Sequence, residues 1–312
     1  MKKLLLMLAA LMLGLMLGGC GGDKSPGSDM QLTLGLMPDT ESIPLVVAEM
    51  EGYFDDEGVD VTLIHFKSAR DRDSALQSGE LDGVVTDMVS VFFNNEGGIP
   101  LQATARTNGR LALMAGKNSG ITEFTAGQVA DKTLGLSLNT VMEYTADSLL
   151  AGHGLSVDAQ YKTAVPQIPT RMEMLQGGQL DMAIMPDPFV SMALADGALL
   201  LTDTTGFEHT AGVFAFHRDV IQERPEAVKA VMRAFEAAVA DLNQQGIEPW
   251  KDNVIENMGL PEASHELLVL PAYNSAVPTE ETFQAVQGWM HDKELITEEY
   301  AYGDIVVNWE QF

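Results

Sequence analysis

The chain has 312 residues, of which 46% are hydrophobic, enough for one large domain or two modest ones with proper cores. It contains 45 acidic and 18 basic residues, which gives a formal net charge of −27. Because a protein that binds a phosphate backbone needs a basic face, this balance argues against nucleic acid as a partner.

The N-terminal residues predict export. Lys2 and Lys3 precede an uncharged apolar run from Leu4 to Leu17, and two glycines then lead to Cys20. A basic start, an apolar segment and small residues are typical of a secretory signal, and the run is shorter than the roughly 20 residues that a membrane span needs. Cys20 is the only cysteine of the chain, so no internal disulfide is expected.

The end of this segment, Leu17-Gly18-Gly19-Cys20, resembles the bacterial lipobox, in which the cysteine is diacylated and becomes the new N-terminus. We therefore expect residues 1–19 to be a signal peptide and Cys20 to be the lipidation site. Residues 20–30 are rich in Gly, Ser and Asp, which predicts a flexible lipid-anchored tether. The folded part should begin near Gln31.

The first folded unit alternates predicted strands and helices. Strands are expected at residues 32–36, 59–66, 84–85 and 101–104, and helices at residues 44–52, 68–79 and 88–94. Pro44 and Ser68 stand at helix starts, where proline and a capping hydroxyl are favoured. This alternation predicts a mostly parallel sheet covered by helices on both faces.

The second unit repeats that plan after a strand at residues 111–115, which leaves the first unit. Strands are expected at residues 134–138, 160–164 and 182–185, and helices at residues 144–151, 169–176 and 188–195. Residues 213–216 form a return strand. A long amphipathic helix starts at Pro225, and further helices are expected at residues 250–258, 262–269 and 279–291.

The second unit is thus inserted into the first. We predict an α/β fold with two lobes, each a mostly parallel sheet flanked by helices, and two crossing strands as the hinge. Lobe 1 comprises residues 31–113 and 216–312, and lobe 2 comprises residues 114–215. The C-terminal helices should pack on lobe 1.

An internal repeat supports this plan. Residues 76–82 and 175–181 share the pattern Leu-Gln-x-Gly-x-Leu-Asp, and a Thr-Leu-Gly-Leu segment lies upstream of each copy. Gly35 and Gly79 are 44 residues apart, and Gly135 and Gly178 are 43 apart. A shared order at a shared spacing indicates two similar α/β units. The shared part is expected to be scaffold, and the residues after it to determine specificity.

Ligands of open α/β sheets bind beyond the carboxyl ends of the strands, facing helix N-termini. The residues that follow the predicted strands are therefore candidate ligand contacts. They are Pro38, Asp39, Thr40, Ser42, Thr86, Asp87 and Arg106 in the first unit, and Ser137, Asn139, Thr140, Pro186, Asp187 and Phe189 in the second. Helix capping alone is an alternative role for Ser42, Asp87, Asn139 and Asp187. Arg106 has the alternative of pairing with a surface carboxylate.

Three segments resemble the solute-binding proteins of ABC importers, in the branch that binds aliphatic sulfonates, taurine, nitrate and thiamine pyrimidine precursors. Glu51-Gly52-Tyr53-Phe54 and Glu57-Gly58-Val59 are similar to the branch's "GYF…EGL" opening, and residues 76–82 to its "L.sGqlD" segment. Residues 214–239, with Arg224-Pro225-Glu226-Ala227-Val228, are similar to its "nPe.v" segment. The resemblance covers about residues 31–292.

This resemblance implies a periplasmic-binding-protein-like fold, with a small ligand closed between the lobes and delivered to a membrane permease driven by a cytoplasmic ATPase. We expect an exported, lipid-anchored monomer at the cell membrane, in the periplasm or at the cell surface. No enzymatic activity, catalytic residue, metal or cofactor is expected.

Two alternatives stay open. A ligand-binding sensor for a membrane receptor would use the same cleft. One branch of the resembled fold is a cytosolic enzyme that makes a thiamine pyrimidine, but that branch has a cysteine-rich iron motif, whereas Cys20 is the only cysteine here.

The predicted cleft contains Asp39, Glu41, Asp87 and Asp187 against Arg106 and Arg110. A dianionic ligand would normally meet more arginine or lysine. The hypothesis is therefore a neutral, zwitterionic or cationic ligand, such as a heterocyclic vitamin precursor or an amine. A sulfonate held by helix N-termini remains the alternative.

Overall fold

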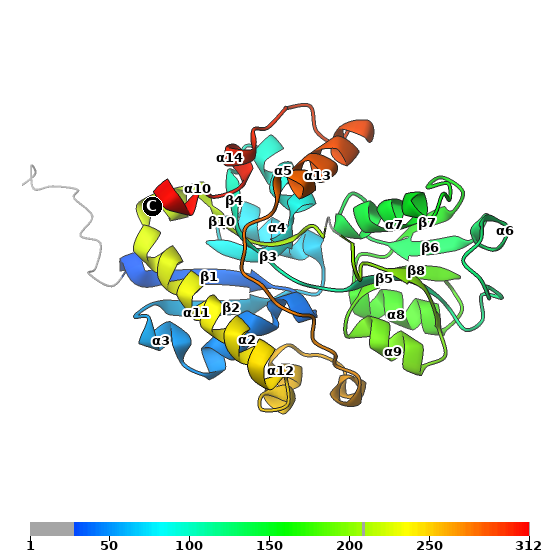
Figure 1. Cartoon of the computed structure of the whole chain (residues 1–312), viewed down its shortest axis with the longest axis horizontal. Coiled ribbons are helices and arrows are strands. Elements are labelled where there is room, and N and C mark those ends of the chain that lie inside the picture. The colour runs from blue at the N-terminus through cyan, green and yellow to red at the C-terminus, as the bar shows by residue number, and fades with distance from the viewer. Residues whose placement is uncertain (1–27, 208–209, 312) are drawn as a thin grey trace, which may run out of the picture.

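The computed structural model describes residues 28–207 and 210–311, so the predicted signal peptide, Cys20 and most of the tether lie outside the described residues. Two α/β lobes lie side by side, each built around a five-stranded sheet (Figure 1). The two-lobed prediction is confirmed. Within the described stretches, none of the helices combines the length and the hydropathy that a membrane span requires.

The sheet of lobe 1 has the strand order β2-β1-β3-β10-β4. Its strands are β1 (Gln31–Leu36), β2 (Asp60–His65), β3 (Gly83–Asp87), β4 (Leu101–Arg106) and β10 (Gly212–His217). Strand β1 pairs in parallel with β2 and β3, whereas β10 is antiparallel to β3 and β4. The mostly parallel prediction therefore holds, with the returning strand as the exception.

The sheet of lobe 2 has the equivalent order, β7-β6-β8-β5-β9. Its strands are β5 (Leu111–Ala115), β6 (Thr133–Leu136), β7 (Tyr161–Ala164), β8 (Met182–Pro186) and β9 (Leu199–Asp203). Here β5 is the antiparallel strand, between β8 and β9. Strand β9 was not among the predicted strands.

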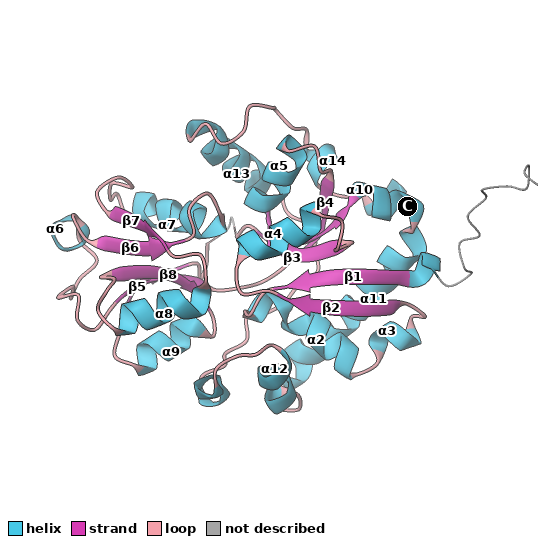
Figure 2. Ribbon diagram, turned by 180° about the vertical axis from the view of Figure 1, so that it is seen from behind, coloured by secondary structure: helices cyan, strands magenta, loops and turns pink. Residues whose placement is uncertain are grey.

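Alternate side chains of each strand enter opposite cores, as the period of two in a strand requires. In β8, Ala183 and Met185 pack under α8 (Ile168–Gln176) and α9 (Phe189–Ala195), whereas Met182 and Ile184 face α7 (Val141–Gly152). Figure 2 shows these helices on the two faces of the sheet. Helix α6 (Ala126–Val129) lies at the far end of lobe 2.

Lobe 1 is larger because the C-terminal helices pack on it, as predicted. One face is covered by α2 (Ile43–Met50), α3 (Tyr53–Asp56), α10 (Arg218–Glu223), α11 (Pro225–Gln245) and α12 (Lys251–Asn257). The other face is covered by α4 (Ala69–Gln77), α5 (Met88–Glu96), α13 (Glu280–Asp292) and α14 (Tyr302–Ile305). The predicted helix at residues 262–269 is wrong: only a short 3₁₀ helix, η3 (Glu262–Glu266), forms, and the chain then runs irregularly past Pro271 and Pro278, which lack backbone donors.

The predicted lobe boundaries fall inside two strands. All of β5 pairs within the sheet of lobe 2, from Leu111 beside Pro186 to Ala115 beside Met182, and all of β10 pairs within lobe 1. The chain therefore leaves lobe 1 after β4 and enters lobe 2 before β5, and it returns to lobe 1 after β9 and before β10, rather than after residues 113 and 215. A strand cannot be divided there because its whole backbone is hydrogen-bonded to one sheet.

The repeated Leu-Asp pair holds each sheet together. Asp82 accepts a hydrogen bond from the N–H of Thr33 (2.8 Å), and Asp181 accepts one from the N–H of Thr133 (2.9 Å). The leucine before each aspartate packs on a glycine of the neighbouring strand, β1 in lobe 1 and β6 in lobe 2. A methyl group at Gly135 of β6 would lie 2.3 Å from Leu180. This packing explains why the sequence repeats both segments at nearly the same spacing.

Candidate ligand-binding cavity

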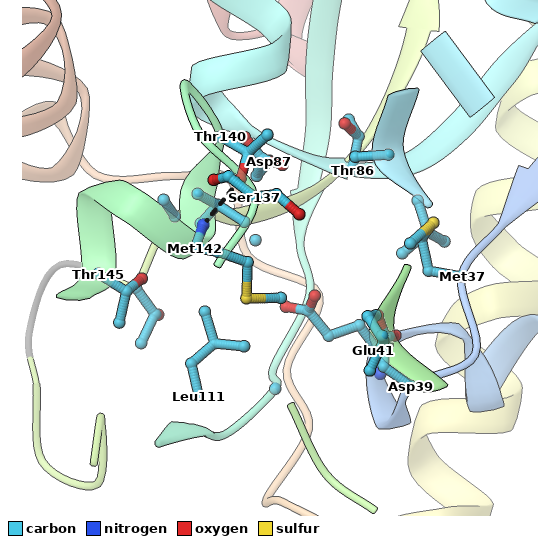
Figure 3. Close-up of a pocket in the computed structure, with 18 of the residues that line it drawn as sticks. Met37, Asp39, Glu41, Thr86, Asp87, Leu111, Ser137, Thr140, Met142 and Thr145 are labelled. Carbon is cyan, nitrogen blue, oxygen red and sulfur yellow. Dashed lines mark hydrogen bonds between the residues drawn. The ribbon is translucent and has the colours of Figure 1, made fainter. Parts of the chain in front are cut away.

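A cavity lies between the lobes, at the carboxyl ends of strands from both sheets (Figure 3). Its volume is about 50 Å³, and a cavity of roughly 10–15 Å³ holds one water, so the space suits a compact molecule. Lobe 1 contributes the apolar Met37 and the polar or charged residues Asp39, Glu41, Arg72, Thr86 and Asp87. Lobe 2 contributes Leu111, Ser137, Thr140, Met142, Thr145, Pro166 and Arg171. This cavity lies at the strand ends where the topology leads us to expect a ligand.

Three carboxyl groups line the lobe 1 wall. Asp39 caps η2 (Thr40–Ser42) by accepting from the N–H of Glu41 (3.1 Å), and Asp87 caps α5 by accepting from the N–H of Ser90 (2.9 Å). Burial raises the pKa of both aspartates to about 6, against the opposing effect of Arg72. Capping and a place on the cavity wall thus coexist in both residues.

Glu41 packs closely against the first inter-lobe crossing and against the start of β10. Its Oε1 accepts from the hydroxyl of Thr107 (3.0 Å), and a methyl group at Gly212 would lie only 1.9 Å from that oxygen. A methyl group at Gly109 would lie 2.5 Å from its Cγ. Burial, with the nearby charge of Asp39, raises the pKa of Glu41 to about 8. Gly109 of the first crossing and Gly212 at the start of β10 therefore make room for this carboxyl group.

Two buried arginines complete the cavity. Arg72 of α4 donates to the carbonyl oxygen of Val85 (3.1 Å) and to the carboxylate of Asp73 (2.8 Å). Arg171 of α8 donates to the carbonyl oxygen of Ile184 (2.7 Å) and to the hydroxyl of Ser137 (2.8 Å). Arg72 is 2% exposed and Arg171 is 0% exposed. Neither was predicted.

A signal for both arginines was present in the repeat. Arg72 and Arg171 stand four residues before the repeated Leu76 and Leu175. Extending the repeat by one helical turn toward the N-terminus would have found them, since residues four apart share a helix face. Thr86 is a further group of interest, because its buried Oγ1 has no hydrogen-bond partner within the described residues.

Five predicted residues line the cavity: Asp39, Thr86, Asp87, Ser137 and Thr140. Three others lie in a wider groove beside it, namely Thr40, Arg106 and Asp187. Arg106 donates to the side chain of Asn274 (3.1 Å), and Asp187 accepts from Arg110 (2.6 Å) and from the hydroxyl of Ser191 (2.9 Å). These two side chains are thus held by neighbours outside the cavity.

The remaining five predicted residues are not on the cavity wall: Pro38, Ser42, Asn139, Pro186 and Phe189. The hydroxyl of Ser42 accepts from the N–H of Met37 (3.0 Å), and Phe189 is buried in the core of lobe 2. Asn139 is exposed, with a left-handed φ of 56°, and its N–H donates to Glu143 (2.8 Å). A position directly after a strand is therefore not sufficient for a place on the cavity wall, because the conformation of the local turn determines which side chain enters the cavity.

The lobes also touch outside the cavity. The N–H of Thr40 donates to the carbonyl oxygen of Asp187 (3.2 Å) on one side. On the other side, Lys293, which follows α13, donates to Glu143 of α7 (2.7 Å), and the indole of Trp289 donates to Asp147 (3.2 Å). Contacts on both sides of the cavity show lobes that have come together.

A family model described as the NMT1-like family matches residues 25–249, more than two thirds of the chain. The chain belongs to the NMT1-like family. No curated protein matches the sequence.

Solved structures share the fold of this NMT1-like protein at low sequence identity. The alkanesulfonate-binding protein SsuA from Xanthomonas axonopodis pv. citri, bound to MOPS, is 18% identical; 89% of this chain and 96% of that chain are covered, with a TM-score of 0.74. The ligand-binding component of an ABC-type import system from Staphylococcus aureus, with zinc bound, is 14% identical, with the same coverage and a TM-score of 0.75. The desulfurization enzyme DSZB is 15% identical over 89% of this chain and 96% of that chain, with a TM-score of 0.63.

Proposed function

We propose that this protein is the extracytoplasmic solute-binding component of an ABC uptake transporter, which captures a small organic molecule between its lobes and delivers it to a permease. The observation behind this proposal is the cavity itself. Buried ionisable groups of both lobes line it, and the described chain passes from lobe 1 to lobe 2 and back once. A ligand that touches both walls stabilises the closed arrangement, which is the state that a permease can recognise.

The proposed ligand contacts are the predicted residues on the cavity wall, together with Glu41 of the predicted cleft and the two arginines that the fold adds. They are Asp39, Glu41, Arg72, Thr86, Asp87, Ser137, Thr140 and Arg171. Likeness to ligand-binding proteins of import systems supports the class of function, and the position of these residues supports the site.

Export and anchoring belong to the same proposal. Residues 1–19 would be removed as a signal peptide, Cys20 would carry the lipid, and residues 20–30 would tether a monomer to the membrane. Cell fractionation of the wild type and of Cys20→Ala tests this: the wild type should stay with membranes and the variant should be released.

An enzyme is the second candidate, because the desulfurization enzyme has the same fold and carboxyl groups with raised pKa, such as Glu41, are typical of acid–base catalysis. Incubation of the protein with the molecule that it binds, followed by mass spectrometry, separates the two. Unchanged ligand after many hours is expected, and turnover would favour the enzyme.

Native mass spectrometry of protein purified from its source should detect a co-purifying small molecule. Removal of that molecule and its return should change the radius of gyration in small-angle X-ray scattering, since the lobes open and close. A protein that carries no small molecule and keeps one shape under all conditions would contradict the proposal.

A further inference from the structure

The two lobes present the same buried arginine to the cavity, and this similarity identifies the class of ligand, provided that the proposed function holds. Arg72 and Arg171 are 99 residues apart, and so are their carbonyl acceptors Val85 and Ile184. Both guanidinium groups are therefore placed by the repeated scaffold. Any difference between them arises from their neighbours.

Those neighbours differ in charge. Asp73 is bonded to Arg72, and Asp87 and Asp39 act on it through their charge. In the repeat, these three aspartates correspond to Met172, Pro186 and Asn139. Each carboxylate around the arginine of lobe 1 is thus replaced by a neutral residue around the arginine of lobe 2.

Arg171 consequently keeps an uncompensated charge. It is fully buried, and it donates to the carbonyl oxygens of Val165 (3.0 Å), Pro166 (3.4 Å) and Ile184 and to the hydroxyl of Ser137. None of the carboxylates in residues 28–207 and 210–311 forms an ion pair with it. Burial alone lowers its pKa to about 9. A buried cation without a counter-charge costs free energy, which an anionic ligand group would offset.

The opposite wall has the opposite excess. Asp39, Glu41 and Asp87 line it together with Arg72, whose charge is already paired with Asp73. Figure 3 shows Asp39 and Glu41 on one side of the cavity, and Met142 and Thr145 of α7 on the other. The cavity therefore presents carboxyl groups toward lobe 1 and, in lobe 2, the guanidinium group of Arg171 without an ion pair.

We propose that the ligand is a compact zwitterion, whose anionic group binds Arg171 and Ser137 of lobe 2 and whose cationic group faces Asp39, Glu41 and Asp87 of lobe 1. Such a molecule satisfies each wall with its own charge, and neither end alone contacts both lobes. The same geometry disfavours a simple anion, which would meet the carboxyl groups, and a simple amine, which would leave Arg171 unpaired.

Isothermal titration of the full protein, stripped of co-purified molecules, tests this with length-matched probes. The zwitterions are β-alanine, γ-aminobutyrate and taurine, and the matched single charges are propionate, butyrate, ethanesulfonate and the corresponding primary amines. At least one zwitterion should bind at least about tenfold more tightly than its matched anion and amine. Equal binding of an anion or an amine, or no zwitterion with a Kd below about 10 mM, would overturn the proposal.

Substitutions of Arg171 test whether this residue binds the anionic group of the ligand. Arg171→Met keeps a similar side-chain volume without the charge and should lower the affinity for the zwitterion by at least about tenfold. Arg171→Lys should lower this affinity by less. Arg233→Met, on the exposed face of α11, is the matched control and should leave binding unchanged. If Arg171→Met does not fold, Arg171→Lys decides: unchanged affinity in that variant contradicts a guanidinium contact.

Failure of this inference differs from failure of the transport function. If the co-purified molecule proves neutral or singly charged and still closes the lobes, the binding function stands and the proposal of a zwitterionic ligand is wrong. If nothing co-purifies, nothing binds and the shape never changes, both are wrong.

Discussion

Lys293 of lobe 1 is bonded to Glu143 of lobe 2 at 2.7 Å, and this ion pair joins the lobes away from the cavity. The same ammonium group also reaches Asp147 (3.2 Å). Both acids belong to α7, whose first turns line the cavity. The inter-lobe ion pair and part of the cavity wall therefore belong to the same helix.

Lys293→Met should weaken ligand binding, because it removes a contact that only the closed arrangement makes. A partly exposed pair contributes modestly, so a loss of about threefold to tenfold in affinity is expected by titration calorimetry. Lys162→Met is the control: Lys162 bonds the same two acids at 2.9 and 2.7 Å but from within lobe 2. It should lower thermal stability without changing affinity, and an equal loss of affinity in both variants would contradict the closure role.

Glu41→Gln should change how stability depends on pH. Burial raises the pKa of Glu41 from 4.5 to about 8, so the folded state binds more protons than the unfolded state between these values. The stability associated with protonated Glu41 is present below about pH 4.5 and is lost as the pH rises to about 8. At pH 8 the variant should melt about 2–6 °C above the wild type, and the difference should shrink toward pH 5. Scanning calorimetry at several pH values measures this, with the exposed Glu80→Gln as control.

Gly212→Ala should disturb the same carboxyl group by steric means. The added methyl would lie 1.9 Å from Oε1 of Glu41 and 2.6 Å from the hydroxyl of Thr107, so Glu41 must move. Overpacking of this kind costs about 1–3 kcal/mol of stability. Ligand affinity should fall as well. Gly288→Ala in α13 has no atom within 4 Å of the new methyl and should stabilise the protein by about 0.5–1 kcal/mol, which controls for the glycine substitution itself.

Asp181→Ala should lower stability without changing ligand affinity, because Asp181 belongs to the repeated scaffold and not to the cavity wall. The carboxylate accepts from both the N–H and the hydroxyl of Thr133 at 2.9 Å, and it does not line the cavity. Loss of these bonds should cost about 1–3 kcal/mol in urea unfolding. Ligand affinity measured well below the melting temperature should stay unchanged, and a large loss of affinity would show that the repeat takes part in binding.

Local patterns predicted much of the architecture, since strand alternation, helix start signals and glycine stops depend on neighbours in sequence. They failed where tertiary packing decides. Residues 111–115 were recognised as a strand, but their membership of the second sheet depends on pairing with β8, far away in the sequence. The irregular segment after Glu266 lost its predicted helix in the same way, through contacts and prolines beyond the local pattern.

The site was predicted to a smaller extent. Asp87 caps α5 and lines the cavity, because a strand end that meets a helix start fixes both roles at once. Asp187 stands one residue beyond the place in the sequence that is equivalent to Asp87, and it pairs with Arg110 in the neighbouring groove. The charge count behind the ligand hypothesis changes accordingly: Asp187, Arg106 and Arg110 are not on the cavity wall, and Arg72 and Arg171 are.

The sequence by itself determined two similar α/β units, one inserted in the other, with the shared Leu-Asp segment as scaffold, because repetition and periodicity are properties of the chain alone. Only the tertiary structure decided which charges meet. Each arginine lies one helical turn before the repeated leucine. It reaches the cavity because α4 packs on β3 and α8 packs on β8 at the same register. Their opposite surroundings, acidic in lobe 1 and neutral in lobe 2, arise from residues that are brought together by folding, and this contrast determines the charge of the space between the lobes.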